Sequence, residues 1–157
     1  MPRWMTYVLT LLIVVLVGIA VAAPIGPMPG LRLGGSEAIA PDQWSAASLP
    51  EEVHLATFDG MLPYVVIIWV VESGNQLYVI GAPDSTWVEK ATNSPDVRVR
   101  IGDNAYDMRA TRLNPGPQHL FQKYIDRYKD NYPDIIAGFP PIEEFSQGAA
   151  LFELTRR

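Results

Sequence analysis

One uncharged apolar run near the N-terminus constrains this chain more than any other feature. It covers residues 5–23, MTYVLTLLIVVLVGIAVAA, and Pro24 follows it directly. About 20 apolar residues in a helix span the hydrocarbon core of a bilayer, and a proline stops the helix that precedes it. Residues 1–23 are therefore predicted to form one transmembrane helix that anchors the chain in a membrane.

The charges beside this run set its predicted orientation. Arg3 precedes the run, and the next basic residue is Arg32. Basic residues favour the cytoplasmic side, so we expect a single-pass protein of the cytoplasmic membrane with its domain on the extracytoplasmic, periplasmic side. A cleaved signal peptide is the alternative, because Ala20-Val21-Ala22 fits an A-x-A cleavage pattern. Both interpretations place the domain outside the cytoplasm.

Composition excludes several classes of function. The 157 residues contain no cysteine, which excludes disulfides, thiolate metal sites and thiol catalysis. The net charge is -5 without a basic cluster, so no nucleic acid is expected as a partner. His54 and His119 stand apart from any carboxylate motif, so we predict no metal site and assign no catalytic residue.

A Pro/Gly-rich segment, residues 24–44, separates the apolar run from the domain at 45–157. Its first part reads PIGPMPGLRLGGSEAIAP, a composition typical of an extended tether. Clearance from the membrane is its simplest role. The stretch GLRLGG can also fold back over the domain, and Arg32 is then its only charge.

Periodicity and turn signals predict a mainly β domain with two helices. The first helix begins at Asp84 or Ser85 and ends at Asn93, and the second runs from Pro117 to Tyr132. Residues 134–145 are predicted to be an irregular cover. The predicted strands are residues 53–58, 62–71, 76–82, 97–101, 106–113 and 149–155.

The strand at 97–101 alternates apolar residues with Arg98 and Arg100. Its apolar face can meet the apolar face of strand 106–113 through a loop of either two or four residues. A three-residue loop would pair buried with exposed side chains. Both allowed registers place Asp107 opposite one of the two arginines, which gives a cross-strand ion pair.

Residues 76–101 carry a resemblance to a known family. The turn Asn93-Ser94-Pro95-Asp96-Val97, between a short helix and a strand, is similar to the Asn-x-Pro-x-Val turn of the FMN-binding split-barrel superfamily. Pyridoxamine 5'-phosphate oxidase and deazaflavin-dependent nitroreductases typify that group. A looser likeness, Ile125-Asp126 with Tyr128-Lys129 and Tyr132, points to uncharacterised members. The resemblance covers residues 53–157 and implies a split β-barrel of about six mostly antiparallel strands with two helices.

The resemblance also implies a cofactor, FMN or a deazaflavin, with its phosphate at the start of the first helix. Ser85 matches the serine of the family's Ser-x-Lys motif, but Trp87 stands in place of the lysine. The long strand at 62–71 also lacks the family's basic residues, and burying a phosphate dianion among apolar side chains is costly. The candidate cofactor-binding residues are Ser85, Thr86, Trp87, Lys90, Arg98 and Arg100.

Two functions therefore stay open. One is a flavin- or deazaflavin-dependent oxidoreductase tethered to the membrane. The other is a non-enzymatic binding or assembly module that has lost the cofactor and sits beside a membrane-protein partner. In both cases we expect a homodimer, because strand 62–71 is apolar on both faces and one barrel interior covers only one of them.

Overall fold

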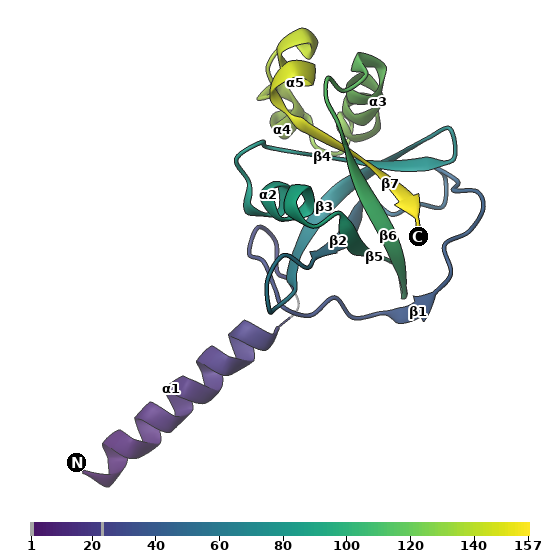
Figure 1. Ribbon diagram of the computed structural model, residues 1–157. Coiled ribbons are helices and arrows are strands. Elements are labelled where there is room, and N and C mark those ends of the chain that lie inside the picture. Colours follow the sequence, from purple (N-terminus) through teal and green to yellow (C-terminus); the bar gives the residue numbers. More distant parts are fainter. Residues whose placement is uncertain (1, 23) are drawn as a thin grey trace.

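The computed structural model describes residues 2–22 and 24–157, and its centre is a closed six-stranded barrel (Figure 1). Neighbouring strands are antiparallel in the order β6-β5-β2-β3-β4-β7, and pairing of β6 with β7 closes the barrel. This confirms the predicted split barrel. The strands are β2 (Glu52–Thr57), β3 (Tyr64–Ser73), β4 (Gln76–Gly81), β5 (Asp96–Ile101), β6 (Asn104–Leu113) and β7 (Ala150–Arg156).

Helices lie at both ends of the barrel. The two predicted helices are α2 (Thr86–Asn93) and α3 (Gln118–Tyr128). The irregular cover predicted at 134–145 was wrong, because two short helices form there, α4 (Pro133–Ala137) and α5 (Ile142–Gly148). Helices of five and seven residues are too short to show an apolar stripe at helical spacing, so periodicity misses them.

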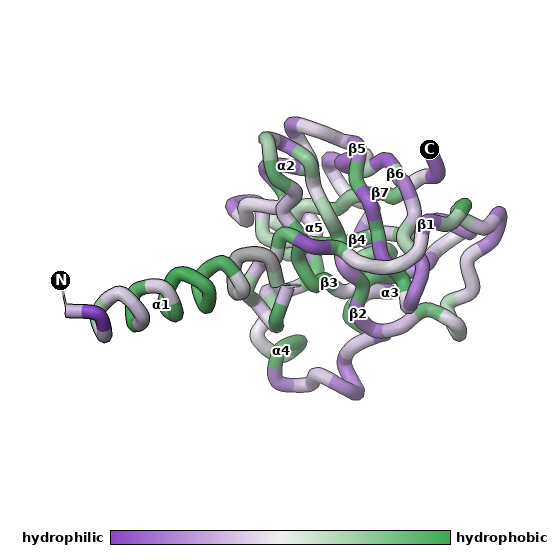
Figure 2. Tube along the Cα trace, turned by 90° about the horizontal axis from the view of Figure 1, so that it is seen from below, coloured by the Kyte–Doolittle hydropathy of each residue, from purple (hydrophilic) through white to green (hydrophobic). Residues whose placement is uncertain are grey.

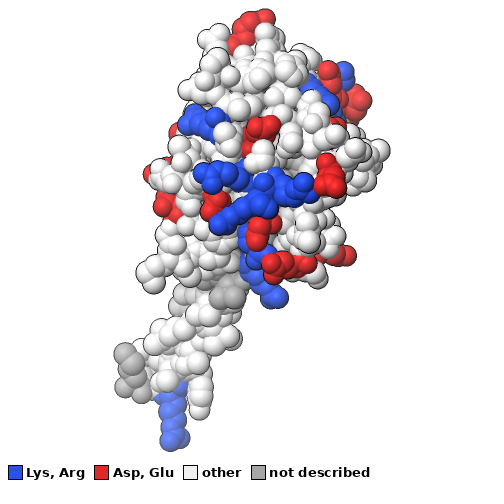
Figure 3. All heavy atoms as spheres, turned by 45° about the vertical axis from the view of Figure 1, so that its right-hand side comes forward, with Lys and Arg blue, Asp and Glu red and all other residues white. Residues whose placement is uncertain are grey.

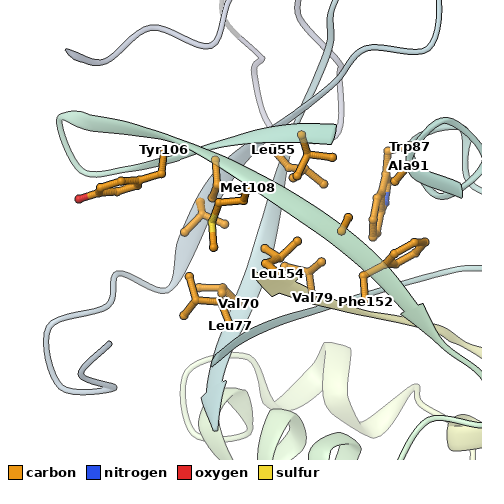
Figure 4. Packing of buried hydrophobic residues seen from close by; sticks show 14 of the residues in the cluster. Leu55, Val70, Leu77, Val79, Trp87, Ala91, Tyr106, Met108, Phe152 and Leu154 are labelled. Atoms are coloured by element: carbon orange, nitrogen blue, oxygen red, sulfur yellow. The ribbon is translucent and has the colours of Figure 1, made fainter. Parts of the chain in front are cut away.

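The barrel interior holds the larger of two apolar clusters (Figure 4). Alternate residues of each strand point inward, as the period of two requires. Trp87 and Ala91 of α2 close the cluster, and Phe152 lies against the Trp87 ring at 5.5 Å between centroids. The strand residues labelled in Figure 4 are Leu55, Val70, Leu77, Val79, Tyr106, Met108, Phe152 and Leu154.

The register of β5 and β6 is the shorter of the two that the sequence allowed. Ile101 pairs with Asn104, which leaves a loop of two residues, Gly102 and Asp103. Arg98 is consequently opposite Asp107, and its Nε lies 2.7 Å from the carboxylate Oδ1. The apolar side chains of β5 and β6 meet inside the barrel, as the register argument required.

The second apolar cluster lies outside the barrel, beneath α3, α4 and α5, and we call it the cap. Trp69 of β3 stacks on Tyr128 of α3, with 4.3 Å between ring centroids and 11° between ring planes. The Tyr128 hydroxyl accepts a hydrogen bond from the Val70 N–H at 3.0 Å and lies 2.6 Å from the carbonyl oxygen of Glu51. Tyr128 therefore joins β3 to the chain that enters β2.

The N-terminal segment begins with α1 (Arg3–Val21), which projects away from the barrel (Figure 2) and exposes apolar side chains between Trp4 and Val17. In the part of the chain that the structure describes, we find no helix that is both long and apolar enough to cross a membrane. The transmembrane span therefore stays a prediction. Met1 and Ala23, the end residues of the predicted 1–23 segment, lie outside the described residues.

The tether folds back over the barrel, which is one of the two courses that its sequence allowed. Ile25 and Met28 pair with each other in a tight turn, and Gly30 then pairs with Val65 of β3. Further on, β1 (Ser36–Ala38) adds a short parallel strand to the edge of β6. The tether is thus part of the folded domain along much of its length.

Candidate functional site

A cavity of about 510 Å³ lies between the folded-back tether and the outer face of β2 and β5. We call it the tether cavity. Volumes between about 300 and 1,000 Å³ are typical of sites for small molecules and cofactors. Residues 31–35 of the tether form one wall, and Ala56 of β2 and Arg98 of β5 form the other. Phe58 and Pro63, which flank the loop between β2 and β3, add apolar surface.

Main-chain and arginine contacts hold the tether over this cavity. Gly30 and Val65 exchange two backbone hydrogen bonds, of 2.8 and 2.9 Å. The Arg100 guanidinium donates to the Leu33 carbonyl oxygen at 3.3 Å and to the Gly102 carbonyl oxygen at 2.9 Å. Gly34 has a φ of +70°, and a Cβ there would come within 3.1 Å of the Arg100 guanidinium. Glycine therefore lets the tether turn close against the sheet.

Two basic side chains and one acidic side chain line the tether cavity. Arg98 and Arg32 supply positive charge from opposite walls, and Glu37 supplies negative charge from β1. Arg98 is about one-third exposed, and its Nε approaches Asp107 without the angle of a hydrogen bond. The guanidinium is thus held by an ion pair through a buried Nε.

One face of the domain carries a band of basic side chains with acidic ones beside it (Figure 3). Several arginines of the domain form ion pairs: Arg109 and Arg157 both approach Asp96, and Arg156 contacts Asp42. Such exposed pairs contribute little to stability, but they offset part of the local positive charge.

His54 lies beneath the tether, directly across from Arg100 in the pairing of β2 and β5. Burial lowers the pKa of His54 below its usual value, and the neighbouring Arg100 charge lowers it further. Its Nδ1 is buried and has no hydrogen-bond partner among the described residues. The imidazole is consequently neutral near pH 7. Because His54 lies under the tether, its pKa reports whether the tether covers it.

The start of α2 does not form a cavity with the arginines. Ser85 Oγ donates to the Ala82 carbonyl oxygen at 2.8 Å, and Thr86 is the first residue of α2. Trp87 lies in the barrel core with 7% of its surface exposed, so its ring is unavailable to a cofactor. Gly81 is needed beneath it, because a Cβ there would come within 2.2 Å of the Trp87 ring.

Lys90 fastens the loop that borders the tether cavity. Its Nζ donates to the Asp59 carbonyl oxygen at 2.7 Å, and Asn93 donates to the Asp59 carboxylate at 3.0 Å. Phe58, the neighbour of Asp59, lines the cavity. Of the six predicted residues, the structure therefore brings Arg98 and Arg100 together at the tether, ties Lys90 to the loop that borders the tether cavity, and leaves Ser85, Thr86 and Trp87 elsewhere.

Sequence reasoning raised Arg32 only as a basic residue that could reach the start of α2, because it is the only charge in a stretch that can fold back over the domain. It did not select Phe58 or Pro63 as site residues. Their positions inside the predicted strands 53–58 and 62–71 hid them, whereas in the structure β2 ends at Thr57 and β3 begins at Tyr64. Only the folded-back tether shows that these residues share one cavity.

Comparison with known proteins shows to which family the chain belongs. The profile of a family described as an uncharacterized protein conserved in bacteria (DUF2255) matches residues 46–144, which is more than half of the chain. The chain belongs to this family. No curated protein matches it.

Solved structures share the fold at low sequence identity. An F420 reductase is 19% identical, with 76% of this chain and 96% of that chain covered and a TM-score of 0.51. A FAD-binding protein from Mesorhizobium loti is 19% identical, with coverage of 71% and 83% and a TM-score of 0.51. The heme storage protein HutZ from Vibrio cholerae is 17% identical, with coverage of 68% and 82% and a TM-score of 0.52. These likenesses show that the chain shares the split-barrel fold of these proteins.

Proposed function

We propose that this chain is a membrane-held oxidoreductase that binds a flavin or a deazaflavin in the tether cavity. The observation that carries the proposal is the cavity itself, with one arginine on each of two opposite walls, beside the same kind of barrel on which an F420 reductase and a FAD-binding protein are built. Arg98 and Arg32 are the residues that would hold the cofactor's phosphate. The proposal therefore moves the phosphate away from Ser85 and Thr86.

The residues of the tether cavity fit such a group in size and chemistry. Arginine is well suited to phosphate because its planar fork donates two parallel hydrogen bonds. Phe58 and Pro63 offer apolar surface against which a flat ring system can lie. The cofactor would supply the redox chemistry, and this chain would bind it, orient it and keep water from part of its surface.

A second function, a binding or assembly module without a cofactor, is favoured by one observation. Asp107 already neutralises Arg98, and Glu37 adds a negative charge to the tether cavity, so a phosphate would meet less net positive charge than the arginines suggest. In this alternative the tether cavity takes a less charged ligand or serves a neighbouring membrane protein.

Attachment and assembly are proposed on separate grounds. The exposed apolar side chains of α1 support membrane anchoring, with Trp4 at 65% and Tyr7 at 73% exposure near its start. A homodimer stays a prediction, and the structure weakens the argument for it that rests on the two apolar faces of β3. The cap covers part of the outer face of β3, and Gly30 of the tether pairs with the edge of β3 within one chain, so burial of that strand does not require a second copy.

The test is a titration of the purified full chain in detergent. Visible absorbance is recorded first, and FMN and a deazaflavin are then added while the absorbance or fluorescence of the cofactor is followed. Tight binding of either one is expected, and Arg98→Gln should weaken it about tenfold or more, because a charge-assisted hydrogen bond is lost. Arg112→Gln, an exposed arginine further along β6, is the matched control and should bind as wild type. A colourless chain that binds neither would favour the second function.

A further inference from the structure

Two short segments of the domain expose large apolar side chains close together. Outside α1, the exposed large apolar residues among those described are Ile25, Met28, Ile39, Phe58, Met61, Leu62 and Ile135. Five of the seven fall in the turn at 25–28 and the loop at 58–63. Met61 is 100% exposed and Leu62 63% exposed, so water-facing methionine and leucine stand side by side at the tip of the loop.

One pair of hydrogen bonds brings the two segments to the same end of the domain. Gly30, which follows the turn at 25–28, bonds to Val65, which follows the loop at 58–63. α1 reaches the domain at this turn, because it ends at Val21. Figure 1 shows α1 leaving the barrel at the end opposite to α3, α4 and α5. The exposed apolar side chains therefore lie around the point where α1 meets the domain.

The end of the domain where α1 meets it and the cap end also differ in charge. Arg32 is the only charged residue at 24–35, and Asp59 is the only one at 58–65. The Asp59 carboxylate accepts from Asn93, and the Lys90 ammonium group lies 2.7 Å from the Asp59 carbonyl oxygen. The far end is acidic, since residues 126–144 carry five acidic and two basic side chains. The α1 end therefore carries little net charge, whereas a negatively charged surface would repel the acidic cap.

We propose that the turn at 25–28 and the loop at 58–63 rest on the lipid bilayer into which α1 inserts. The inference rests on the proposed membrane insertion of α1 and adds a fixed orientation of the domain. Exposed apolar tips with little net charge are the chemistry that the interfacial region of a bilayer takes up. Phe58 and Pro63 also line the tether cavity, so its ligand would enter beside the membrane.

The experiment uses the absence of cysteine in the chain. Met61→Cys carries a nitroxide in the full chain, which is reconstituted into vesicles of phosphatidylcholine with one-third phosphatidylglycerol. Collisions of the nitroxide with oxygen and with a water-soluble nickel complex report its depth. Ile39→Cys is the matched control, because Ile39 is 89% exposed and apolar but lies outside both segments. Tyr7→Cys reports insertion of α1 separately.

At Met61 the nitroxide is expected to lose most of its nickel collisions and to gain oxygen collisions, while the label at Ile39 stays in water. If the Tyr7 label is in the bilayer and the Met61 label is in water, the turn at 25–28 and the loop at 58–63 do not rest on the bilayer, although α1 inserts into it. If both labels are in water, the anchor and the resting surface both fail.

Discussion

The cap and the tether contact β3 in two different ways, and the contrast separates structure from function. At the cap, Trp69 stacks on Tyr128, whose hydroxyl bonds to the backbone at Val70. At the tether, Val65 bonds to Gly30 by main chain alone, and a cavity remains beside it. The cap fills its space with aromatic side chains, whereas the tether leaves a space lined by arginines.

This difference indicates which side of the domain binds a ligand. Burial of aromatic rings and satisfaction of backbone groups are what folding requires, and the cap supplies both. A charged cavity stabilises nothing by itself, because Arg98 and Arg32 would fold as well on an open surface. We therefore interpret the cap as structural and the tether side as the ligand-binding side.

The largest expected effect comes from truncating the cap. Phe121 of α3 is fully buried, so Phe121→Ala should lower the free energy of unfolding by about 3–5 kcal/mol. Leu31→Ala in the half-buried wall of the tether cavity should lower it by only about 1 kcal/mol. Urea unfolding of the full chain in detergent measures both. Equal losses would contradict the contrast between cap and tether.

Removing a single hydroxyl tests how the cap is joined to the sheet. Tyr128→Phe keeps the stacked ring but leaves buried backbone groups at Val70 without their partner, which should cost about 1–3 kcal/mol. Tyr132→Phe is the control, because its hydroxyl bonds only to the Glu51 side chain in a more exposed position. Its loss should stay below about 1 kcal/mol. The reverse order of the two losses would show that Tyr128 does not join the cap to β3.

The sequence predicted the barrel well because its signals are local. Alternation in β5 and β6, with Asp107 placed to meet an arginine, limited the register to two choices, of which one is observed. The tether cavity could not be predicted, because it depends on residues 31–35 meeting residues far along the chain. Trp87 shows the opposite case, since it stands at the lysine position of a cofactor motif but fills the barrel core.

Gly34 tests how closely the tether must approach the sheet. Gly34→Ala places a Cβ against Arg100 at a positive φ, so we expect a loss of about 1–2 kcal/mol and weaker ligand binding. Gly26→Ala has a similar φ of +54° but no neighbour within 4 Å, and it serves as the control. Both variants should share the backbone strain, and only Gly34→Ala should also weaken binding. Unchanged binding would mean that the tether does not shape the site.

The smallest expected effect is a pH dependence of stability that arises from His54, which lies beneath the tether. Burial depresses the pKa of His54 in the folded chain, so between that pKa and the usual value of 6.5 the unfolded chain binds more protons. Stability should therefore fall as pH drops below about 6.5 and be unaffected by His54 above it. Urea unfolding at pH 7.5 and 5.5 should show less of this fall in His54→Gln. An identical fall in that variant would show that His54 is not the group responsible.

The central claim is that the ligand lies in the tether cavity, and one titration tests it most directly. FMN and a deazaflavin are added to the full-chain wild type, to Arg98→Gln, and to the double variant Ser85→Ala with Thr86→Ala. The account predicts that Arg98→Gln weakens binding about tenfold or more, while the double variant at the start of α2 binds as wild type. Weakened binding in the double variant alone would place the phosphate at α2 and contradict the account.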